Sequence, residues 1–558
     1  MKERRKREAV VNMITVTFPR GGQIEVEEGT PVRTVIEDDG KILAASVDFL
    51  TVDLGYRLLR DCSVLPLTYD YKEGREVYRR TLSFILAAAV SRVCPGHLLK
   101  IGHSLAGGYY YDLEGIEEVS PKLLSKIEEE MKKLIQAARP IQKHFVSAAR
   151  AMEIFSERGR EDKVLLLKRN LRHDIGVYEL DGFFDIPIGP LAPDTGRTPF
   201  FRLVPYNLGF VLRFPDKKDI TKMTAPSEQT RLFAVYHESK KWSSILGIST
   251  VGDINEVIAE GNFAECVQVA EGLHEKRIAA IADQIVESHR RGAPLVFIAG
   301  PSSSGKTTFA KRLSVQLRVN GLRPLALGLD DYFVDREKTP RDERGEFDFE
   351  SLYALDIERF NDDLLALLDG RTVTPPRFDF KSGLSVPGER SLRLEKDQVL
   401  IVEGIHGLND ALTPRIPGER KFKIYVSALT QLTIDFHNRI PTTDTRMIRR
   451  IVRDRKFRGY SAAETIRRWP SVIRGESRNI FPFQESADVI FNTALLYELA
   501  VLRPYARRAL EEVPPDQPEF AEARRILEFI QLFLEGDERV VPPTSLLREF
   551  IGGSSFKY

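Results

Sequence analysis

The segment GPSSSGKT at residues 300–307 restricts the fold of this chain more than any other stretch. It follows the apolar run LVFIA, typical of a buried strand, and precedes TTFAKRLSVQLRV, typical of a helix. Its spacing is that of the Walker A motif, G-x-x-x-x-G-K-[ST], whose backbone N–H groups surround phosphate groups at the positive end of a helix. The sequence therefore predicts a nucleotide site between the two elements. Phosphate contacts are expected from Gly300, Ser302, Ser303, Ser304, Gly305, Lys306, Thr307 and Thr308.

Strand-like and helix-like runs alternate from residue 294 to about residue 493. The strand-like runs are LVFIA, RPLALGL, QVLIVEG, KFKIYVS and DVIFN. Such alternation favours a parallel sheet covered by helices on both faces. This half of the chain is therefore predicted to be α/β, with the phosphate loop directly after its first strand.

Acidic residues follow two of these runs. Asp330 in LDDYF follows the second run and is expected to accept a proton from an incoming hydroxyl group, whereas Asp331 suits a helix N-cap. Glu403 ends the run QVLIV and is expected beside a Mg²⁺ ion that the Thr307 hydroxyl also binds, while Lys306 reaches the β- and γ-phosphates. Motors and switches share such loops, but an acceptor-side carboxylate favours a kinase.

The stretch DTRMIRRIVRDRKFRG, residues 444–459, has seven Arg or Lys residues against two Asp residues. Several of these cations are expected to face solvent. Arg446, Arg449, Arg450 and Arg453 fall at helical spacing i, i+3, i+4 and i+7, so they form one cationic stripe. In a phosphate-binding protein, such a stripe is typical of a lid that neutralises charge during transfer.

Together these motifs resemble the uridine kinase/phosphoribulokinase family, most closely its uridine–cytidine kinase branch, over roughly residues 294–500. FDFES at 347–351, PPRFDF at 375–380 and VEGI at 402–405 also carry the resemblance. It implies transfer of the γ-phosphate of ATP or GTP, with Mg²⁺, to the 5′-hydroxyl of a nucleoside. The implied catalytic residues are Asp330, Lys306 and Arg453; the implied substrate contacts are Asp330, Tyr332, Asp348, Phe378 and Arg450; Arg453 and Arg458 join the nucleotide contacts, and Thr307 and Glu403 bind the metal.

The chain departs from this family at the base side of the site. Phe378 and Gly383 stand where the eukaryotic enzymes have Tyr and a base-reading His, and Tyr460 replaces a lid Arg. The loss of one hydrogen-bond partner changes the free energy by which a site discriminates between two bases by about 1–3 kcal/mol. The sequence therefore does not predict the base, and uridine is the default acceptor. His406 in EGIHGLN is shared with the phosphoribulokinase branch, which keeps a sugar or other small alcohol as an alternative acceptor; a buried structural role for His406 is equally open.

The first 230 residues have a different pattern. MITVTFPRGGQIEVEE at 13–28 alternates with period two across a Gly-Gly turn and predicts a β-hairpin. The unit that it opens resembles a TGS domain, the β-grasp module that begins threonyl-tRNA synthetase. IGHSLAGGYYYDLEG, FSERGREDKVLLL and DGFFDIPIGPLAP resemble elements of that synthetase's second, editing domain. This half is therefore predicted to be a β-grasp unit followed by an α+β unit, in which Ser120 caps a helix over 120–137.

The resemblance places Arg80, Phe84, Pro187 and Leu191 at the four positions where the synthetase has metal-site or catalytic His and Cys residues. None of these four side chains can bind a metal or act as a general base. Editing hydrolysis is therefore not expected. Two interpretations remain: a scaffold or regulatory module, which is favoured, and an RNA- or ligand-sensing module with a basic patch at Lys163, Lys168, Arg169 and Arg172.

Length and composition set the remaining expectations. The 558 residues exceed one core, and we expect domains at 1–72, 73–235, 236–292 (helical connector), 293–512 (kinase) and 513–558 (a helical tail with a weakly ordered end). A formal net charge of +1 and scattered Cys62, Cys94 and Cys266 predict no strong nucleic-acid bias and a cytoplasmic protein. No apolar run is long enough to span a membrane. A homo-oligomer is expected, and an RNA-binding regulator with a nucleotide switch is the alternative from another class.

Overall fold

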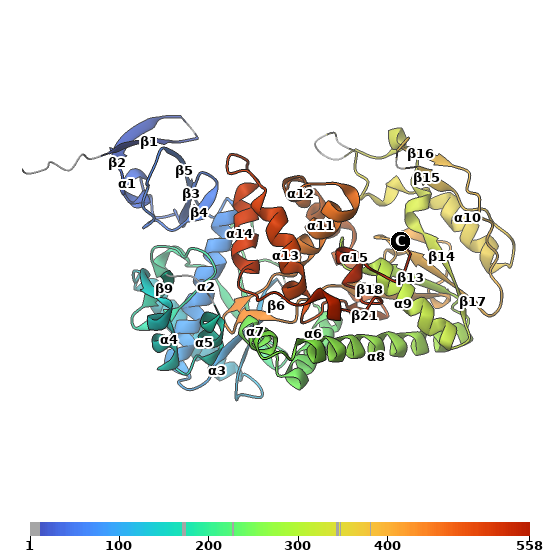
Figure 1. The fold of residues 1–558 in the computed structure, drawn as a ribbon, viewed down its shortest axis with the longest axis horizontal. Helices are drawn as coiled ribbons and strands as arrows, with labels where there is room; N and C mark the ends of the chain where they lie inside the picture. The colour runs from blue at the N-terminus through green and yellow to red at the C-terminus, as the bar shows by residue number, and fades with distance from the viewer. Residues whose placement is uncertain are drawn as a thin grey trace, which may run out of the picture.

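The computed structural model describes residues 12–19, 21–105, 107–169, 174–225, 228–341, 345, 347–379 and 381–557. The predicted fold class is confirmed, because two α+β units precede an α/β unit with a parallel sheet. Figure 1 shows the small first unit at one corner, the second unit below it, and the parallel sheet at the opposite end of the molecule. Arg172 and Phe380, which belong to the motifs above, lie outside the described residues.

The first unit is a five-stranded sheet in the order β2-β1-β5-β3-β4. β1 and β5 pair in parallel and the other pairs are antiparallel, which is the β-grasp arrangement. The predicted hairpin is confirmed, since Met13 lies opposite Glu27, and Ile14 and Val16 of β1 alternate into a small core. The elements are β1 (Met13–Thr17), β2 (Gln23–Glu27), α1 (Val32–Val35), β3 (Ala44–Val47), β4 (Leu50–Val52) and β5 (Cys62–Leu67).

The second unit packs helices against two antiparallel sheets, ordered β11-β12-β7-β6 and β10-β9-β8. The long helix α2 supplies a continuous run of buried residues to this core. Ser120 caps α3 as predicted, because its hydroxyl accepts the N–H of Leu123 at 3.3 Å. The elements are α2 (Lys72–Val93), β6 (Leu99–Leu105), β7 (Gly108–Leu113), α3 (Pro121–Gln136), β8 (Gln142–Ser147), α4 (Ala148–Ser156), α5 (Glu161–Lys168), β9 (Asp174–Leu180), β10 (Phe183–Asp185), β11 (Arg202–Tyr206) and β12 (Gly209–Arg213).

Three helices connect the two halves: α6 (Thr230–Leu246), α7 (Val251–Ala259) and α8 (Phe263–Arg290). Thr250 begins α7 with a capping box that Asp253 completes. The helix α8 runs along one side of the molecule to the parallel sheet, where it packs on α9 (Figure 1). These helices agree with the helical character expected for this segment.

The carboxy-terminal half contains a five-stranded parallel sheet in the order β14-β17-β13-β18-β21. All five residues of the central strand β13 are buried, because helices and their separate hydrophobic clusters cover both faces. The elements are β13 (Leu295–Ala299), α9 (Lys306–Val319), β14 (Arg323–Gly328), α10 (Ile357–Leu368), β15 (Arg377–Asp379), β16 (Leu384–Val386), β17 (Gln398–Glu403), β18 (Lys421–Ser427), β19 (Thr433–Asp435), β20 (Asn438–Arg439), α11 (Thr442–Arg458), α12 (Ala462–Asn479), β21 (Val489–Asn492) and α13 (Glu498–Glu511).

The carboxy-terminal tail contains α14 (Phe520–Ile530) and α15 (Arg548–Ile551). The expectation of a weakly ordered end is wrong for the described residues. Leu546, Phe550 and Ile551 are almost fully buried in the core that also holds α11 and α13. The described tail therefore packs with α11 and α13, and its Leu546 lies close to Gly305 of the phosphate loop.

The short hairpin of β19 and β20 links the two halves of the chain. Thr433 forms a bridge with Thr250, and the N–H of Ile101 in β6 donates to the carbonyl of Phe436 at 2.8 Å. The hairpin lies between the sheet strand β18 and the arginine-bearing helix α11 in the sequence. A segment of the carboxy-terminal half is thus built into the amino-terminal half.

A buried ionic cluster surrounds this hairpin. Lys163 of α5 is fully buried, and its Nζ lies 2.5 Å from Asp185 Oδ1 and 3.0 Å from Asp435 Oδ2. His437 contacts Asp185 through Nδ1 at 2.5 Å, and Arg160 lies against the His437 ring. Asp435 of the carboxy-terminal half therefore helps to neutralise Lys163 of the amino-terminal half, together with Asp185.

This cluster corrects the expectation of a basic patch for RNA. Lys163 cannot reach a nucleic acid, since it is buried among carboxylates. Lys168 and Arg169 both pair with Glu256, at 2.5 and 2.8 Å. The three described members of the expected patch therefore form ion pairs within the chain.

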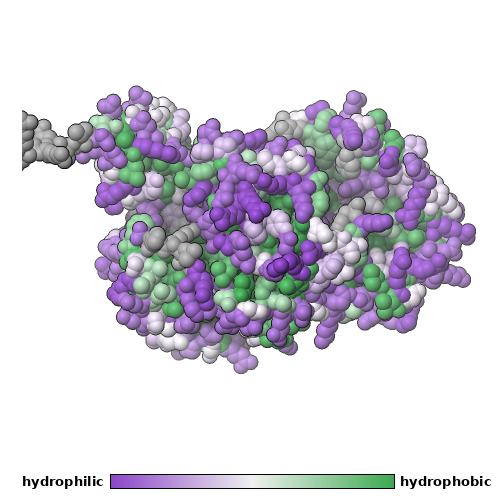
Figure 2. Space-filling view, viewed as in Figure 1, coloured by the Kyte–Doolittle hydropathy of each residue, from purple (hydrophilic) through white to green (hydrophobic). Residues whose placement is uncertain are grey.

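The surface that is visible in one view of the molecule is mainly hydrophilic (Figure 2). Figure 2 shows hydrophilic residues over most of the visible face, with hydrophobic residues between them near the centre. Among the described residues, no helix combines the length and the apolar character needed to cross a membrane.

Candidate active site

The phosphate loop follows β13 and ends where α9 begins at Lys306. Ser303 and Gly305 have positive φ values of 57° and 84°, which turn the loop toward the helix start. Only glycine fits at position 300, because a Cβ atom there would stand 2.0 Å from the Val426 carbonyl oxygen. Lys306 donates from Nζ to the carbonyls of Gly300 at 2.9 Å and Pro301 at 3.3 Å, so its ammonium group lies across the loop.

Thr307 and Glu403 lie together at the carboxyl end of the sheet. The Thr307 hydroxyl donates to Glu403 Oε1 at 2.8 Å. Glu403 ends β17 opposite Ile298 of β13, which brings it beside the loop. Partial burial raises the pKa of Glu403, while Lys306 and the Thr307 hydrogen bond oppose this.

These two side chains fit a Mg²⁺ ion. The ion prefers oxygen ligands and is usually held by one or two carboxylates together with substrate phosphates and water. No group of three or more His, Cys, Asp or Glu side chains suited to a metal occurs in the described parts of the chain. A metal at this place would therefore depend on a nucleotide for its remaining ligands.

Asp330 lies in a 3₁₀ turn, Leu329–Tyr332, directly after β14. The strand β14 is not the direct neighbour of β13, because β17 lies between them, but all three strands end at the same edge. The Asp330 carboxylate reaches solvent, yet surrounding protein desolvates it and raises its pKa, and the charges of Lys306 and Arg458 act in the opposite direction. The predicted acceptor-side carboxylate thus lies within electrostatic range of the loop lysine.

Tyr332 does not lie in the site. It is fully buried, its hydroxyl donates to Asp363 at 2.8 Å, and its ring packs edge-on against Phe360 of α10. This placement corrects the expectation that Tyr332 contacts a substrate, since its side chain belongs to the core under the sheet.

The FDFES segment brings Glu350 within electrostatic range of the loop lysine, Lys306. Asp348 accepts the backbone N–H of Glu350 at 3.2 Å. Desolvation by burial and the charge of Glu476 raise the pKa of Glu350 to about 7, against the opposing charges of Lys306 and Arg450. The sequence does not single out Glu350, because nothing in the motif distinguishes a solvated glutamate from one that is packed beside a lysine.

The Glu350→Gln substitution tests this environment through stability. The pKa of about 7 in the folded chain exceeds the ordinary value of 4.5, so the folded state binds the proton more tightly. The resulting stabilisation is complete below about pH 4.5 and is lost as the pH rises through about 7. We expect the wild type to lose about 1–3 kcal/mol relative to Glu350→Gln between acidic and mildly alkaline pH, measured by denaturant unfolding. The exposed Glu358→Gln is the control, and an equal response of both variants would contradict the prediction.

The predicted cationic stripe divides into two parts. Arg446 and Arg449 are almost fully buried and form ion pairs with Glu476 and Glu498. Arg446 Nε also donates to the Ser302 carbonyl at 2.9 Å. These two arginines therefore lie buried against the phosphate loop and stabilise it. The expectation that they belong to a lid is wrong.

Three further arginines of α11 gather around Asp454, and Arg450 among them contacts the loop. Arg450 donates to the Ser302 hydroxyl at 2.9 Å and to Asp454 at 3.2 Å. Arg453 and Arg458 lie 3.0 and 3.4 Å from Asp454, which is almost fully buried. One carboxylate thus gathers three guanidinium groups near the loop.

The base side of the expected site holds aromatic and arginine side chains. Phe378 is buried, and its ring centroid lies 5.4 Å from that of Phe333. A Cβ atom on Gly383 would stand 2.7 Å from Arg336 Cζ, so the Arg336 side chain fills the space beside the position of the family's histidine. His406 is only 2% exposed, which favours the structural interpretation of that residue.

A residue of the tail contacts the start of the loop helix. Glu549 Oε2 accepts the Thr308 hydroxyl at 2.6 Å and the Thr308 N–H at 3.4 Å. Leu546 packs over the loop, since its Cδ2 would lie 3.1 Å from a Cβ on Gly305. The first-turn N–H groups of such a helix are donors for phosphate oxygens, so Glu549 holds a carboxylate where an anion is favoured.

In the second unit, three of the four positions of the synthetase-like site are filled by side chains that pack or form hydrogen bonds within the chain. Arg80 donates to the Pro190 carbonyl at 2.7 Å and lies so close to Gly189 that a Cβ there would be 2.8 Å from its Cζ. Phe84 packs edge-on against Phe183, and Leu191 is buried. These side chains supply neither a metal ligand nor a base.

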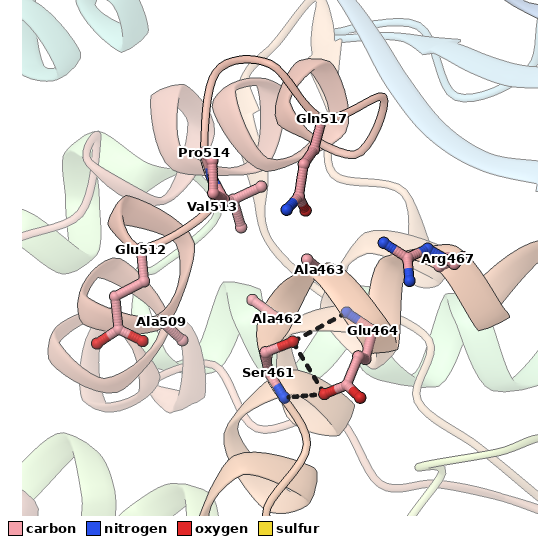
Figure 3. Close-up of a pocket in the computed structure, with 10 residues that line it drawn as sticks. All are labelled: Ser461, Ala462, Ala463, Glu464, Arg467, Ala509, Glu512, Val513, Pro514 and Gln517. Atoms are coloured by element: carbon pink, nitrogen blue, oxygen red, sulfur yellow. Dashed lines mark hydrogen bonds between the residues drawn. The ribbon is translucent and has the colours of Figure 1, made fainter.

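A pocket of about 330 Å³ lies away from this site, between the start of α12 and the end of α13 (Figure 3). Ser461 and Glu464 form a capping box on its wall, and Arg467 pairs with Glu519 at 2.8 Å. Its charged groups Glu464 and Arg467 are therefore paired within the chain, whereas Gln517 has a buried Oε1 without a hydrogen-bond partner among the described residues.

Phosphate loops occur in motors, switches and kinases, but Asp330 near Lys306 and the three arginines around Asp454 are expected of group transfer. By its sheet order and phosphate loop the carboxy-terminal half has the fold of a P-loop nucleotide-binding unit. Residues 295–496 match the model of the phosphoribulokinase / uridine kinase family.

The amino-terminal region has other relatives. The threonine–tRNA ligase of Symbiobacterium thermophilum is 36% identical over 199 residues, which cover 35% of this chain and 31% of the ligase. The threonine–tRNA ligase of Clostridium botulinum strain Langeland is 31% identical over 241 residues, which cover 41% and 38%. The chain spans about a third of the length of the curated relatives that it matches. The predicted likeness to this synthetase is confirmed.

Among solved structures, a possible uridine kinase from Bacillus stearothermophilus is 22% identical to this chain. The match covers 39% of this chain and 98% of that chain, with a TM-score of 0.27.

Proposed function

We propose that this protein transfers the γ-phosphate of ATP or GTP, with Mg²⁺, to the hydroxyl group of a small acceptor, and that the acceptor is a nucleoside. The observation that carries the proposal is the arrangement at three adjacent strand ends: the phosphate loop after β13, the Thr307–Glu403 pair after β17 and Asp330 after β14. Uridine or cytidine is the default acceptor, as in pyrimidine salvage. We keep the cytoplasmic location and the homo-oligomer as predictions.

In the proposed reaction, the loop backbone and Lys306 bind the phosphates. Thr307 and Glu403 would hold Mg²⁺, which neutralises phosphate charge when it is bound. Asp330 orients the acceptor hydroxyl and takes its proton, and its raised pKa supports this role. The negative charge of the transferring phosphoryl group is stabilised by Arg450, Arg453 and Arg458, whose side chains Asp454 positions through ion pairs.

The acceptor side is proposed to use Asp348 for ribose hydroxyl groups and Phe378 against a base. Gly383 lacks a side chain that could recognise a base, and Arg336 lies beside it. An arginine donates in a fixed fork to carbonyl or phosphate oxygens. A sugar phosphate or other small alcohol, in place of a nucleoside, therefore remains the alternative acceptor.

An acceptor panel tests the proposal. Uridine, cytidine, purine nucleosides, ribulose 5-phosphate and pantothenate are each supplied with ATP or GTP and Mg²⁺, and phosphorylated product is measured by mass. The expected result is product from a nucleoside, lost on removal of Mg²⁺. Nucleotide hydrolysis that no acceptor accelerates would instead favour a nucleotide switch.

Glu549→Gln is expected to strengthen nucleotide binding. The Glu549 carboxylate lies on Thr308 at the start of the loop helix, so it repels the phosphates that the loop binds. We expect a dissociation constant about 5- to 10-fold lower, equivalent to about 1 kcal/mol, in a titration with a fluorescent nucleotide. Glu535→Gln, an exposed change on the same tail, should leave the constant unchanged. Equal or weaker binding by Glu549→Gln would show that the carboxylate does not oppose the nucleotide.

A further inference from the structure

A second cavity lies where the two halves of the chain meet. Its volume is about 80 Å³, and its walls come from β6, from α6 and from the segment 430–440 that contains the β19–β20 hairpin. None of the residues of the phosphotransferase site lines it. Cavities between structural units are frequent places for small ligands.

The charge of the lining is positive. Of the sixteen lining residues, Lys100, Lys240 and Arg439 are cationic and none is acidic. Lys100 pairs with Glu114 at 2.7 Å and Lys240 with Asp112 at 2.6 Å, and both acids lie outside the lining. The uncompensated charge therefore belongs to Arg439.

Arg439 has no acidic partner among the residues that the structure describes. Its guanidinium group lies over the ring of Tyr109, with Cζ 4.7 Å from the centroid, and its Nε is buried without a hydrogen-bond partner. A buried donor without a partner lowers stability, and this loss is recovered when an acceptor binds.

Neutral polar groups complete the cavity. Ser243 is 4% exposed, and its hydroxyl has no hydrogen-bond partner. His103 is also buried; burial and the charge of Arg439 lower the pKa of His103 to about 3, so the ring stays neutral. Tyr236 packs edge-on against that ring and lines the same space. The cavity therefore offers one guanidinium group and several neutral donors.

We propose that this cavity binds a small oxyanion, the phosphate or carboxylate group of a metabolite, with Arg439 as its main contact and Ser243 as a second donor. The guanidinium fork matches the geometry of two oxygens on one atom. The site lies apart from the phosphate loop. Because Arg439 stands three residues before the first residue of α11, an occupant would contact the segment that leads into the arginine helix.

The test separates this site from the phosphate loop. Inorganic phosphate and acetate are each titrated into the full chain carrying Lys306→Ala, which weakens the loop site, and binding is followed by calorimetry at constant ionic strength. The expected result is that one of the anions still binds, and that adding Arg439→Gln weakens this binding at least about 10-fold. Ser243→Ala should weaken it less, and the exposed Arg150→Gln should leave it unchanged.

Each outcome either supports or overturns the proposed oxyanion site. Binding of phosphate alone supports a phosphate ester as the natural ligand, and binding of acetate alone supports a carboxylate. If Lys306→Ala abolishes all anion binding, or if neither Arg439→Gln nor Ser243→Ala reduces it, the proposal is overturned. Arg439→Lys provides a second variant should Arg439→Gln fail to fold; it keeps the charge but loses the fork, and it should also weaken binding.

Discussion

Replacing Asp330 with asparagine is expected to lower the rate of phosphoryl transfer by about 100- to 10,000-fold, the usual contribution of a general base. The amide is similar in size but cannot take a proton from the acceptor. Nucleotide affinity should change little, because Asp330 has no hydrogen bond to the phosphate loop in the part of the chain that the structure describes. Steady-state kinetics with the best acceptor of the panel, together with a nucleotide titration, measures both quantities.

Asp331→Asn provides the matched control. Asp331 is the next residue in the same turn, but its carboxylate accepts the backbone N–H of Phe378, so it has a local structural role. This variant should retain most of its turnover. Comparable turnover of Asp330→Asn and wild type would remove Asp330 from the mechanism, and an equal loss in both variants would assign the effect to the turn.

Replacing Lys163 with methionine is expected to destabilise the protein by about 3–5 kcal/mol, because it leaves Asp185 and Asp435 buried without their cation. Both carboxylates are almost fully buried, so water cannot replace the lost charge. The midpoint of denaturant unfolding, followed by fluorescence and by circular dichroism, measures the change. Both halves should respond, since Asp435 belongs to one half and Asp185 to the other.

Lys168→Met is the control for the loss of a lysine from the same helix. Lys168 is half-exposed and pairs with Glu256 at the surface, where such a pair contributes about 1 kcal/mol or less. If both variants unfold at the same midpoint, the buried cluster does not stabilise the junction as described.

Local sequence rules predicted the centre of the site. The loop from Gly300 to Thr307 needs only a strand before it and a helix after it, and both lie in the same short stretch. The Thr307–Glu403 contact also follows from the sequence, because the carboxyl ends of parallel strands meet at one edge. The roles of these residues in catalysis remain predictions.

Contacts between distant segments could not be predicted in this way. Helical spacing placed Arg446 and Arg449 on the same face as Arg450, but it could not show that Glu476 and Glu498 would bury the first two. The LDDYF motif assigns Tyr332 to the substrate. In the structure, the Tyr332 hydroxyl instead donates a hydrogen bond to Asp363 of α10. Glu549 reaches Thr308 across 241 residues, and no local pattern marks it.

The ion pairs between the two halves limit how the chain can be divided into separate fragments. The change of sequence pattern near residue 293 marks where one kind of element gives way to another, but Asp435 and His437 have their charged partners far upstream of it. In a fragment that began there, Asp435 would lose Lys163 and His437 would lose Asp185, so the hairpin that holds them would lack its ionic partners. Such fragments should aggregate or require co-expression with the upstream piece.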